Sequence, residues 1–158
     1  ILMCSDAMNA AIAVLRPHIK SARGGPRVKV IIGVIEGDIH DIGKNIVKIM
    51  LDAAGYDVID LGRDVSPEKF VEAARQAGSG LIGLSTLMST TMENMGKVVR
   101  LLEREGLRDR FRVMIGGGPV SELFAREIGA DGCGRNAKEA VDLADRLSRE
   151  IASCPATA

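Results

Sequence analysis

The stretch VKVIIGVIEGDIHDIGKN, residues 28–45, decides the fold prediction and holds one of the two histidines of the chain. Its first part, VKVIIGVI (28–35), is short, β-branched and almost wholly apolar, which is typical of a strand covered on both faces. Residues 41–54 then predict a helix with one buried face, because apolar residues recur there at helical spacing. Those residues are Ile42, Ile46, Met50 and Ala53.

The same alternation of strand and helix continues along the chain. Apolar runs predict further strands at 56–62, 80–86, 112–118 and 130–134. Helical patterns predict helices at 66–78, 92–105, 119–128 and 137–151. Alternating units with right-handed crossovers predict a doubly wound α/β fold: a five-stranded parallel sheet with helices on both faces. Ligands of such folds bind beyond the carboxyl ends of the strands, near the point where the strand order reverses.

Composition restricts the classes of partner. The chain has 158 residues with 21 Lys+Arg and 21 Asp+Glu, no Trp and one Tyr. This balance gives no electrostatic or stacking reason to expect nucleic acid. No apolar run approaches the roughly 20 residues that span a bilayer, so no membrane association is expected. The cysteines Cys4, Cys133 and Cys154 form no paired pattern, which favours a reducing, cytoplasmic location.

The ends of the chain differ from its centre. Residues 1–22 predict a helix, 23–27 a linker with Gly-Gly-Pro, 28–151 the α/β domain and 152–158 a frayed tail. His18 lies on the first of these segments and is expected at the surface.

Polar residues gather in three loops at the carboxyl ends of the predicted strands. In the first loop, His40 stands between Asp38 and Asp41. The simplest interpretation is a polar loop histidine beside a helix that Asp41 caps. The alternative is a metal ligand, since a neutral imidazole binds metals well and Asp38 is placed to fix its tautomer. One histidine without a cysteine pair does not make a zinc site, so a metal here would have to bring most of its own ligands.

The other two loops contain hydroxyls and glycines. STLMSTTM (85–92) carries five hydroxyls in seven residues, more than the single helix cap expected from one of residues 89–91. This excess favours a polar ligand. GGGPVS (116–121) lacks the spacing of a P-loop or of GxGxxG, so a nucleotide is weakly supported. Glycines also let a flat group lie against the backbone.

Together the segments DIHDIG, LSTLMSTTM and GGGP resemble the cobalamin-binding domain family. Its D-x-H-x-x-G signature is matched by Asp38, His40 and Gly43, and its S-x-L by Ser85 and Leu87. The similarity runs from about residue 28 to 147. The sequence of this region most resembles the small corrinoid methyl-carrier proteins of anaerobic methyltransferase systems, and it is similar to the cobalamin module of methionine synthase.

The resemblance implies a Rossmann-like or flavodoxin-like cobalamin-binding fold, with residues 1–22 as the last helix of an N-terminal helical cap. It implies cobalamin or a related cobamide bound base-off, with His40 as the cobalt ligand, Asp38 as its partner and Thr91 completing a hydrogen-bonded relay. Ser85 is implied to contact the base of the cofactor's tail. The remaining implied contacts are Asp41, Ile42, Gly43, Leu87, Ser89, Thr90, Gly116, Gly117 and Gly118. Replacing Gly117 by Val is expected to block the tail and to leave the fold intact.

The implied function is that of a methyl-carrier subunit rather than a complete enzyme. Its partners would be a substrate-specific methyltransferase and an acceptor methyltransferase, and a homodimer is possible. Two alternatives stay open: the small subunit of an adenosylcobalamin-dependent mutase, and a cobalamin-sensing regulator. A flavodoxin-like nucleotide binder ranks last. The methyl donor, the acceptor and the lower base of the corrinoid are not determined by the sequence.

Overall fold

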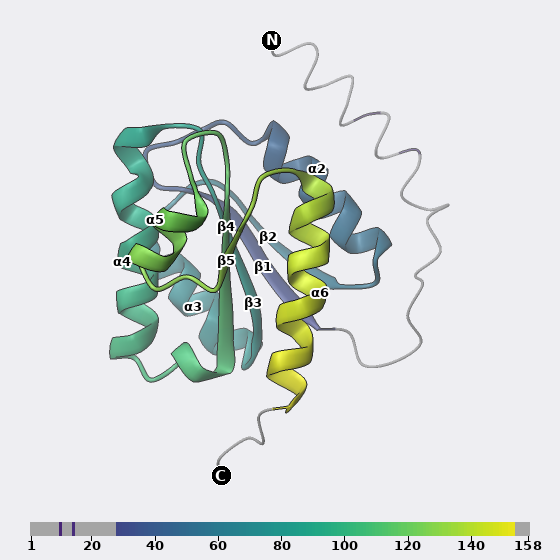
Figure 1. Cartoon of the computed structure of the whole chain (residues 1–158), viewed down its shortest axis with the longest axis vertical. Coiled ribbons are helices and arrows are strands. Elements are labelled where there is room, and N and C mark those ends of the chain that lie inside the picture. The colour runs from purple at the N-terminus through teal and green to yellow at the C-terminus, as the bar shows by residue number, and fades with distance from the viewer. Residues whose placement is uncertain (1–9, 11–13, 15–27, 154–158) are drawn as a thin grey trace.

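The computed structural model describes residues 28–153, together with Ala10 and Val14 (Figure 1). The expectations for a helix at 1–22, for the linker 23–27, for His18 and for residues 154–158 lie outside the described residues. The predicted tail began two residues too early, because the last helix continues to Ser153. No helix in the described part of the chain is long and apolar enough to cross a membrane.

Five parallel strands form a single sheet, as predicted. They are β1 (Lys29–Ile35), β2 (Asp57–Val65), β3 (Gly80–Ser85), β4 (Phe111–Gly116) and β5 (Gly132–Gly134). Their order across the sheet is β2-β1-β3-β4-β5. The chain therefore reverses its direction of winding between β1 and β3, which makes the carboxyl ends of these two strands the switch point where ligands of doubly wound folds bind.

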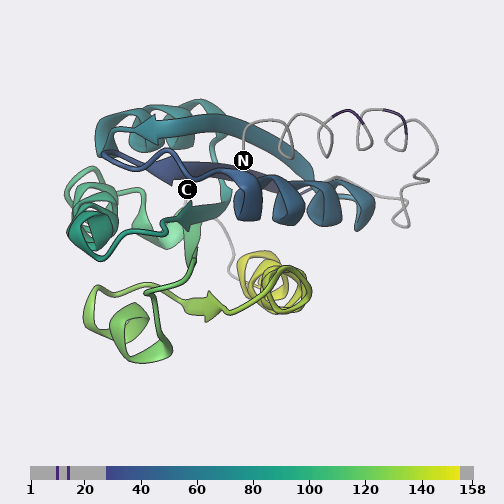
Figure 2. The ribbon, with the colours of Figure 1, turned by 90° about the horizontal axis from the view of Figure 1, so that it is seen from above.

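Helices cover both faces of the sheet. The α-helices are α2 (Ile42–Ala53), α3 (Pro67–Ala77), α4 (Met92–Arg104), α5 (Glu122–Glu127) and α6 (Ala137–Ser153). Two short 3-10 helices are η2 (Ser89–Thr91) and η3 (Arg108–Arg110). Viewed from above, α2 and α6 lie on one side of the sheet, and α3 and α4 on the other (Figure 2).

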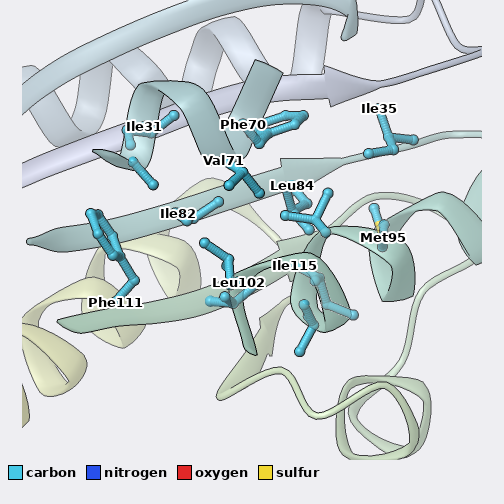
Figure 3. Packing of buried hydrophobic residues seen from close by; sticks show 14 of the residues in the cluster. Ile31, Ile35, Phe70, Val71, Ile82, Leu84, Met95, Leu102, Phe111 and Ile115 are labelled. Atoms are coloured by element: carbon cyan, nitrogen blue, oxygen red, sulfur yellow. The ribbon is translucent and has the colours of Figure 1, made fainter. Parts of the chain in front are cut away.

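Successive residues of the central strands supply two separate apolar cores. On β1, Ile31 packs toward α3 and α4 with Phe70 and Leu102 (Figure 3). Its neighbour Val30 packs toward α2 and α6 with Leu51. This alternation explains why the central strands are apolar at nearly every position: both of their faces are buried.

The buried face of α2 was predicted wrongly. The expected inward residues Ile42, Ile46 and Met50 are each 36–38% exposed, whereas the buried residues of α2 are Lys44 and Leu51. Lys44 can be buried because its Nζ lies 2.6 Å from Oδ1 of Asp60 on β2. A buried charge is tolerated when it is paired in this way.

Asp60 also binds a second lysine of α2. Nζ of Lys48 lies 2.7 Å from its Oδ2, and the backbone N–H of Gly62 donates to its Oδ1 at 2.9 Å. Burial alone would raise the pKa of Asp60, but the hydrogen bonds from Lys44, Lys48 and Gly62 outweigh it and lower that pKa. The charged cluster thus joins α2 to the edge strand β2.

Helix boundaries agree with the sequence to within three residues, but three residues at N-cap positions make no capping hydrogen bond. Ser66 and Thr91 stand at the N-cap positions of α3 and α4, yet neither side chain makes a capping hydrogen bond. Asp41 likewise makes no side-chain cap at α2. Ser121 does cap α5, where its Oγ accepts from the backbone N–H of Phe124 at 3.2 Å. The hydroxyl of Thr91 instead forms a hydrogen bond with that of Thr86.

Candidate functional site

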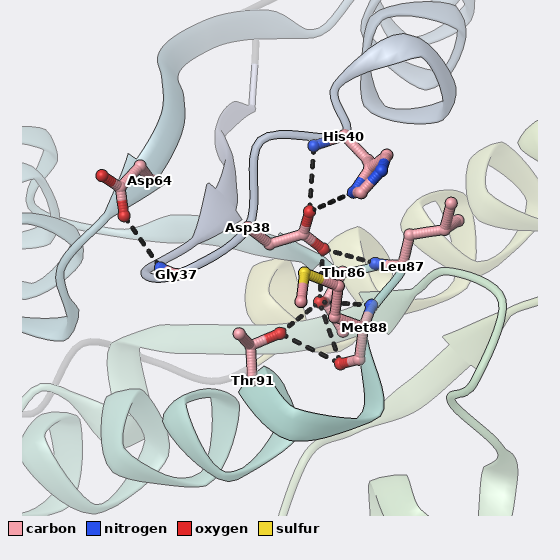
Figure 4. A network of polar contacts seen from close by, with 8 residues as sticks. All are labelled: Gly37, Asp38, His40, Asp64, Thr86, Leu87, Met88 and Thr91. Atoms are coloured by element: carbon pink, nitrogen blue, oxygen red, sulfur yellow. Dashed lines mark hydrogen bonds and ion pairs between the residues drawn. The ribbon is translucent and has the colours of Figure 1, made fainter.

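The three loops singled out in the sequence meet at the carboxyl edge of the sheet. They follow β1, β3 and β4, which are neighbours in the strand order. A network of hydrogen bonds joins the first two loops (Figure 4). The third is tied to the second by a hydrogen bond of 3.2 Å from the backbone N–H of Thr86 to the carbonyl of Gly116.

The loop after β1 is held in place from the side of β2. Gly37 turns the chain with φ of +87°, a conformation that favours glycine. Its N–H donates to Oδ1 of Asp64 at 2.8 Å, and the N–H of Asp64 donates to the carbonyl of Asp38 at 3.1 Å. Asp64 itself has φ of +54°, which aspartate tolerates better than most residues. Sequence reasoning missed Asp64, because nothing local marks it as a partner of residues 37 and 38.

Asp38 is completely buried and its carboxylate accepts four hydrogen bonds. Oδ1 accepts from the backbone N–H of His40 at 2.9 Å and from its Nδ1 at 2.6 Å. Oδ2 accepts from Oγ1 of Thr86 at 2.6 Å and from the backbone N–H of Leu87 at 2.6 Å. Burial by itself would raise the pKa of Asp38, but these four hydrogen bonds hold it well below its usual range. The group is therefore a carboxylate at neutral pH.

This carboxylate determines the tautomer of His40. A carboxylate only accepts hydrogen bonds, so Nδ1 must be the donor. In the neutral ring the lone pair is then on Nε2. The His40 side chain is 53% exposed, and Nε2 forms no hydrogen bond within the described residues. His40 is thus anchored at one nitrogen and free to bind at the other.

Behind Asp38 lie two buried hydroxyls. Oγ1 of Thr86 is 2.6 Å from Oγ1 of Thr91, and both side chains are buried. Thr91 was expected to complete the relay; the structure places Thr86 between Thr91 and Asp38. Thr86 was counted among the hydroxyls of its loop but was not selected as a site residue, since the family pattern S-x-L leaves its position open.

The remaining hydroxyls of this loop are less enclosed. Ser85 ends β3 beside Val34 and Gly116 and is half-buried. Ser89 and Thr90 are exposed. All three lie at the same edge of the sheet as His40 and stay predicted contacts. Asp41, beside His40, contributes its backbone carbonyl to the first turn of α2, where it accepts from the N–H of Asn45 at 2.8 Å.

The four glycines expected to contact the cofactor differ in the space that the protein leaves for a Cβ atom. A Cβ on Gly43, in the first turn of α2, would meet nothing within 4 Å. A Cβ on Gly117 would lie 1.7 Å from the carbonyl oxygen of Thr86, and φ there is +126°. The polypeptide itself therefore requires glycine at 117, and the expectation that Gly117→Val leaves the fold intact is wrong. Gly116 is also tight, with 3.1 Å to the carbonyl oxygen of Gly134, whereas Gly118 has only an ordinary contact with Leu87.

Large apolar side chains are exposed next to His40 in the sequence and in the loop after β3. They are Ile39, Ile42, Leu87 and Met88. The described residues contain no group of three or more His, Cys, Asp and Glu side chains that could hold a metal ion. One available imidazole nitrogen with exposed apolar side chains in the flanking loops fits a large, mostly apolar group whose metal brings its own ligands.

Comparison with known proteins identifies the family. Residues 28–142 match the model of the B12 binding domain, so the chain belongs to that family and its cofactor class is a cobalt corrinoid. The match covers the whole α/β sheet and confirms the resemblance inferred from the three loops.

Individual proteins are similar to this chain over most of its length. The chain is 45% identical over 148 residues to the dimethylamine corrinoid protein of Methanosarcina barkeri, which covers 93% of this chain and 70% of that protein. The structure of the M. barkeri monomethylamine corrinoid protein is similar with a TM-score of 0.80 and 39% identity, over 93% of this chain and 70% of that one. The methanol:cobalamin methyltransferase complex of M. barkeri contains a chain similar with a TM-score of 0.73 and 33% identity, over 97% of this chain and 57% of that one.

Proposed function

We propose that this protein carries a methyl group on a corrinoid that it binds at the carboxyl edge of its sheet, with Nε2 of His40 as the lower ligand of cobalt. The coarse part of the proposal is supported by the relatives: two are named as dimethylamine and monomethylamine corrinoid proteins, and a third is a chain of a methanol:cobalamin methyltransferase complex. The finer part, a base-off and His-on corrinoid, is supported by the geometry of His40 and Asp38.

The observation that carries the proposal is the distance of 2.6 Å between Nδ1 of His40 and Oδ1 of Asp38. A metal-binding histidine commonly donates its second ring N–H to a carboxylate, which fixes the tautomer and raises the basicity of the ligating nitrogen. Because Asp38 is ionised and fully buried, it supports a partial positive charge on the imidazole without competing for the metal.

The other residues of the site would position and shield the cofactor. The exposed side chains of Ile39, Ile42 and Leu87 offer apolar surface for a macrocycle. The open space at Gly43 leaves room beside the histidine. When bound, the corrinoid supplies the methyl-accepting and methyl-donating chemistry of cobalt, and the protein supplies ligation, burial and orientation.

A carrier of this kind needs two partners, and we propose a substrate-specific methyltransferase and an acceptor methyltransferase. Support for the first comes from the similarity to a chain of the methanol:cobalamin methyltransferase complex. The relatives differ in the methyl donor that their names give, so the donor of this protein is left open. A homodimer and a cytoplasmic location stay predictions from the sequence.

Reconstitution with a corrinoid followed by electron paramagnetic resonance of the cobalt(II) state tests the proposal. We expect one corrinoid per chain and a hyperfine pattern from one axial nitrogen. His40→Ala should lose that pattern, while Lys138→Ala, a substitution of an exposed residue of α6, should keep it. A nitrogen pattern that is the same in His40→Ala and in the wild-type protein would refute His40 as the ligand. Absence of any corrinoid after desalting would refute the function as a whole.

A further inference from the structure

The hydroxyl of Thr86 occupies the place where the three loops of the site meet. Thr86 follows the last residue of β3 and is completely buried. Its side chain contacts Asp38 from the loop after β1, and its backbone packs against Gly116 and Gly117 from the loop after β4. In the described residues, Thr91 has no hydrogen bond of its own to Asp38 and reaches it through Thr86.

The donors and acceptors around this hydroxyl define the direction of the network. A threonine hydroxyl has one proton to donate and two lone pairs that accept. Asp38 accepts only, so the proton of Thr86 goes to its Oδ2 at 2.6 Å. The lone pairs then accept from the backbone N–H of Met88 at 3.2 Å and from the hydroxyl of Thr91 at 2.6 Å, whose one proton is shared with the carbonyl of Met88 at 3.0 Å. Every donor and acceptor of the Thr86 hydroxyl is used, and the chain of donors runs from Thr91 through Thr86 to Asp38.

The Asp38 carboxylate is therefore fixed from both sides. His40 occupies Oδ1 with two donors, and the loop after β3 occupies Oδ2 with two donors, Thr86 and Leu87. Loss of the Thr86 hydroxyl would leave Oδ2 with one donor and free the carboxylate to rotate away from the line of Nδ1. Buried polar networks of this kind hold a single arrangement only when every member is satisfied.

We propose that Thr86 is a positioning residue for His40: through Asp38 it holds the imidazole in the tautomer that presents the Nε2 lone pair. The importance of that lone pair rests on the proposed function, in which Nε2 binds cobalt. The tautomer itself does not depend on that function, because it is a property of the protein without corrinoid.

The test is ¹⁵N nuclear magnetic resonance of the histidine rings in the full chain without corrinoid, at a pH well above the ordinary histidine pKa of about 6.5. The chain has two histidines, so a His18→Ala variant assigns the signals of His40. We expect the wild-type ring to carry its proton on Nδ1. Thr86→Val keeps the shape and removes the hydroxyl, and should shift the population toward the Nε2–H tautomer. Thr86→Ser keeps the hydroxyl and should restore the wild-type spectrum.

An unchanged tautomer in folded Thr86→Val would overturn the proposal. If Thr86→Val does not fold, a measurement on the wild-type protein tests the proposal instead. There the Thr86 hydroxyl proton should exchange slowly and show a cross-peak to the amide proton of Leu87, since both donate to Oδ2 of Asp38. Absence of that hydroxyl signal would overturn the assignment of Thr86 as the donor.

A second measurement separates this proposal from the proposed function. Hydroxocobalamin is added, and ligation by imidazole is read from the visible spectrum. We expect Thr86→Val to weaken this ligation about 10-fold, the lower end of the loss typical for residues that orient a metal ligand. A tautomer shift in a protein that binds no corrinoid would refute the function and keep the role of Thr86. Corrinoid binding with equal tautomers and equal ligation in Thr86→Val and wild type would refute the role of Thr86 and keep the proposed function.

Discussion

Substitutions at Gly43 should raise the stability of the protein without corrinoid and lower its affinity for corrinoid. Gly43 is exposed in the first turn of α2, has an ordinary helical backbone, and offers open space to a Cβ. Replacing a helical glycine by alanine stabilises a helix by about 0.5–1 kcal/mol, and leucine behaves much as alanine does. For a chain of this length a gain of that size raises Tm by roughly 1–4 °C.

The cofactor should respond in the opposite direction. If the corrinoid lies against Gly43, one added methyl overlaps with it, and such overpacking costs about 1–3 kcal/mol. Since 1.4 kcal/mol corresponds to a tenfold change in Kd, Gly43→Ala should weaken binding by a factor of roughly 5 to 150. Gly43→Leu should weaken it further, while the fold stays at least as stable as in the wild-type protein.

Thermal unfolding of the protein without corrinoid and equilibrium titration with hydroxocobalamin measure the two effects. Gly96→Ala serves as a control, because Gly96 is a helical glycine on α4 whose Cβ would meet Ile128 at 3.3 Å. The control should not gain stability and should bind corrinoid as the wild-type protein does. Wild-type affinity in a folded Gly43→Leu variant would show that the cofactor does not cover this part of α2.

Two further substitutions test the scaffold, and both are read by chemical unfolding of the protein without corrinoid. Asp60→Asn should cost about 3–5 kcal/mol, because it leaves the buried ammonium of Lys44 without its partner. Asp142→Asn, at an exposed pair of similar length, should cost much less. Equal losses would contradict this account of α2. Because the pKa of Asp60 is lowered by folding, its contribution is present above the ordinary carboxyl pKa of about 3.9 and is lost as the pH falls below it, so the two proteins should converge in stability in acid. Gly117→Ala should lose about 2–4 kcal/mol through backbone strain and displacement of the carbonyl of Thr86, and a wild-type stability would mean that the loop after β4 can move away.

The architecture was predictable because each strand and helix carries its own local signal. The strand 28–35 is apolar at nearly every position, and the sheet order then buries both of its faces. The orientation of α2 was not predictable in the same way. Lysine is usually a surface residue. Lys44 can be buried only because Asp60, 16 positions later on β2, lies next to it.

The site shows the same division between local and distant contacts. Asp38 and His40 are two residues apart, so their hydrogen bond could be inferred from the sequence. Thr86 is 48 residues from Asp38. Their contact depends on β1 and β3 being neighbours and on the turn at Gly37, which brings the chain back over the end of β3. Neither the adjacency of these strands nor the direction of the turn is stated by any local pattern.

These contacts also bear on how the site meets its cofactor. Asp38, Thr86 and Thr91 are buried and joined to one another, and Asp64 and Gly117 lock the neighbouring loops against them. None of these contacts requires a bound group. The nitrogen proposed to bind cobalt therefore projects from a framework that is already assembled, and little conformational entropy is left to lose on binding. It follows that amide hydrogen exchange at residues 37, 38 and 86 should be slow in the protein without corrinoid and should change little on binding, while exchange at the exposed residues 87–90 should slow strongly. Strong new protection at 37 and 38 would show instead that the cofactor assembles this network.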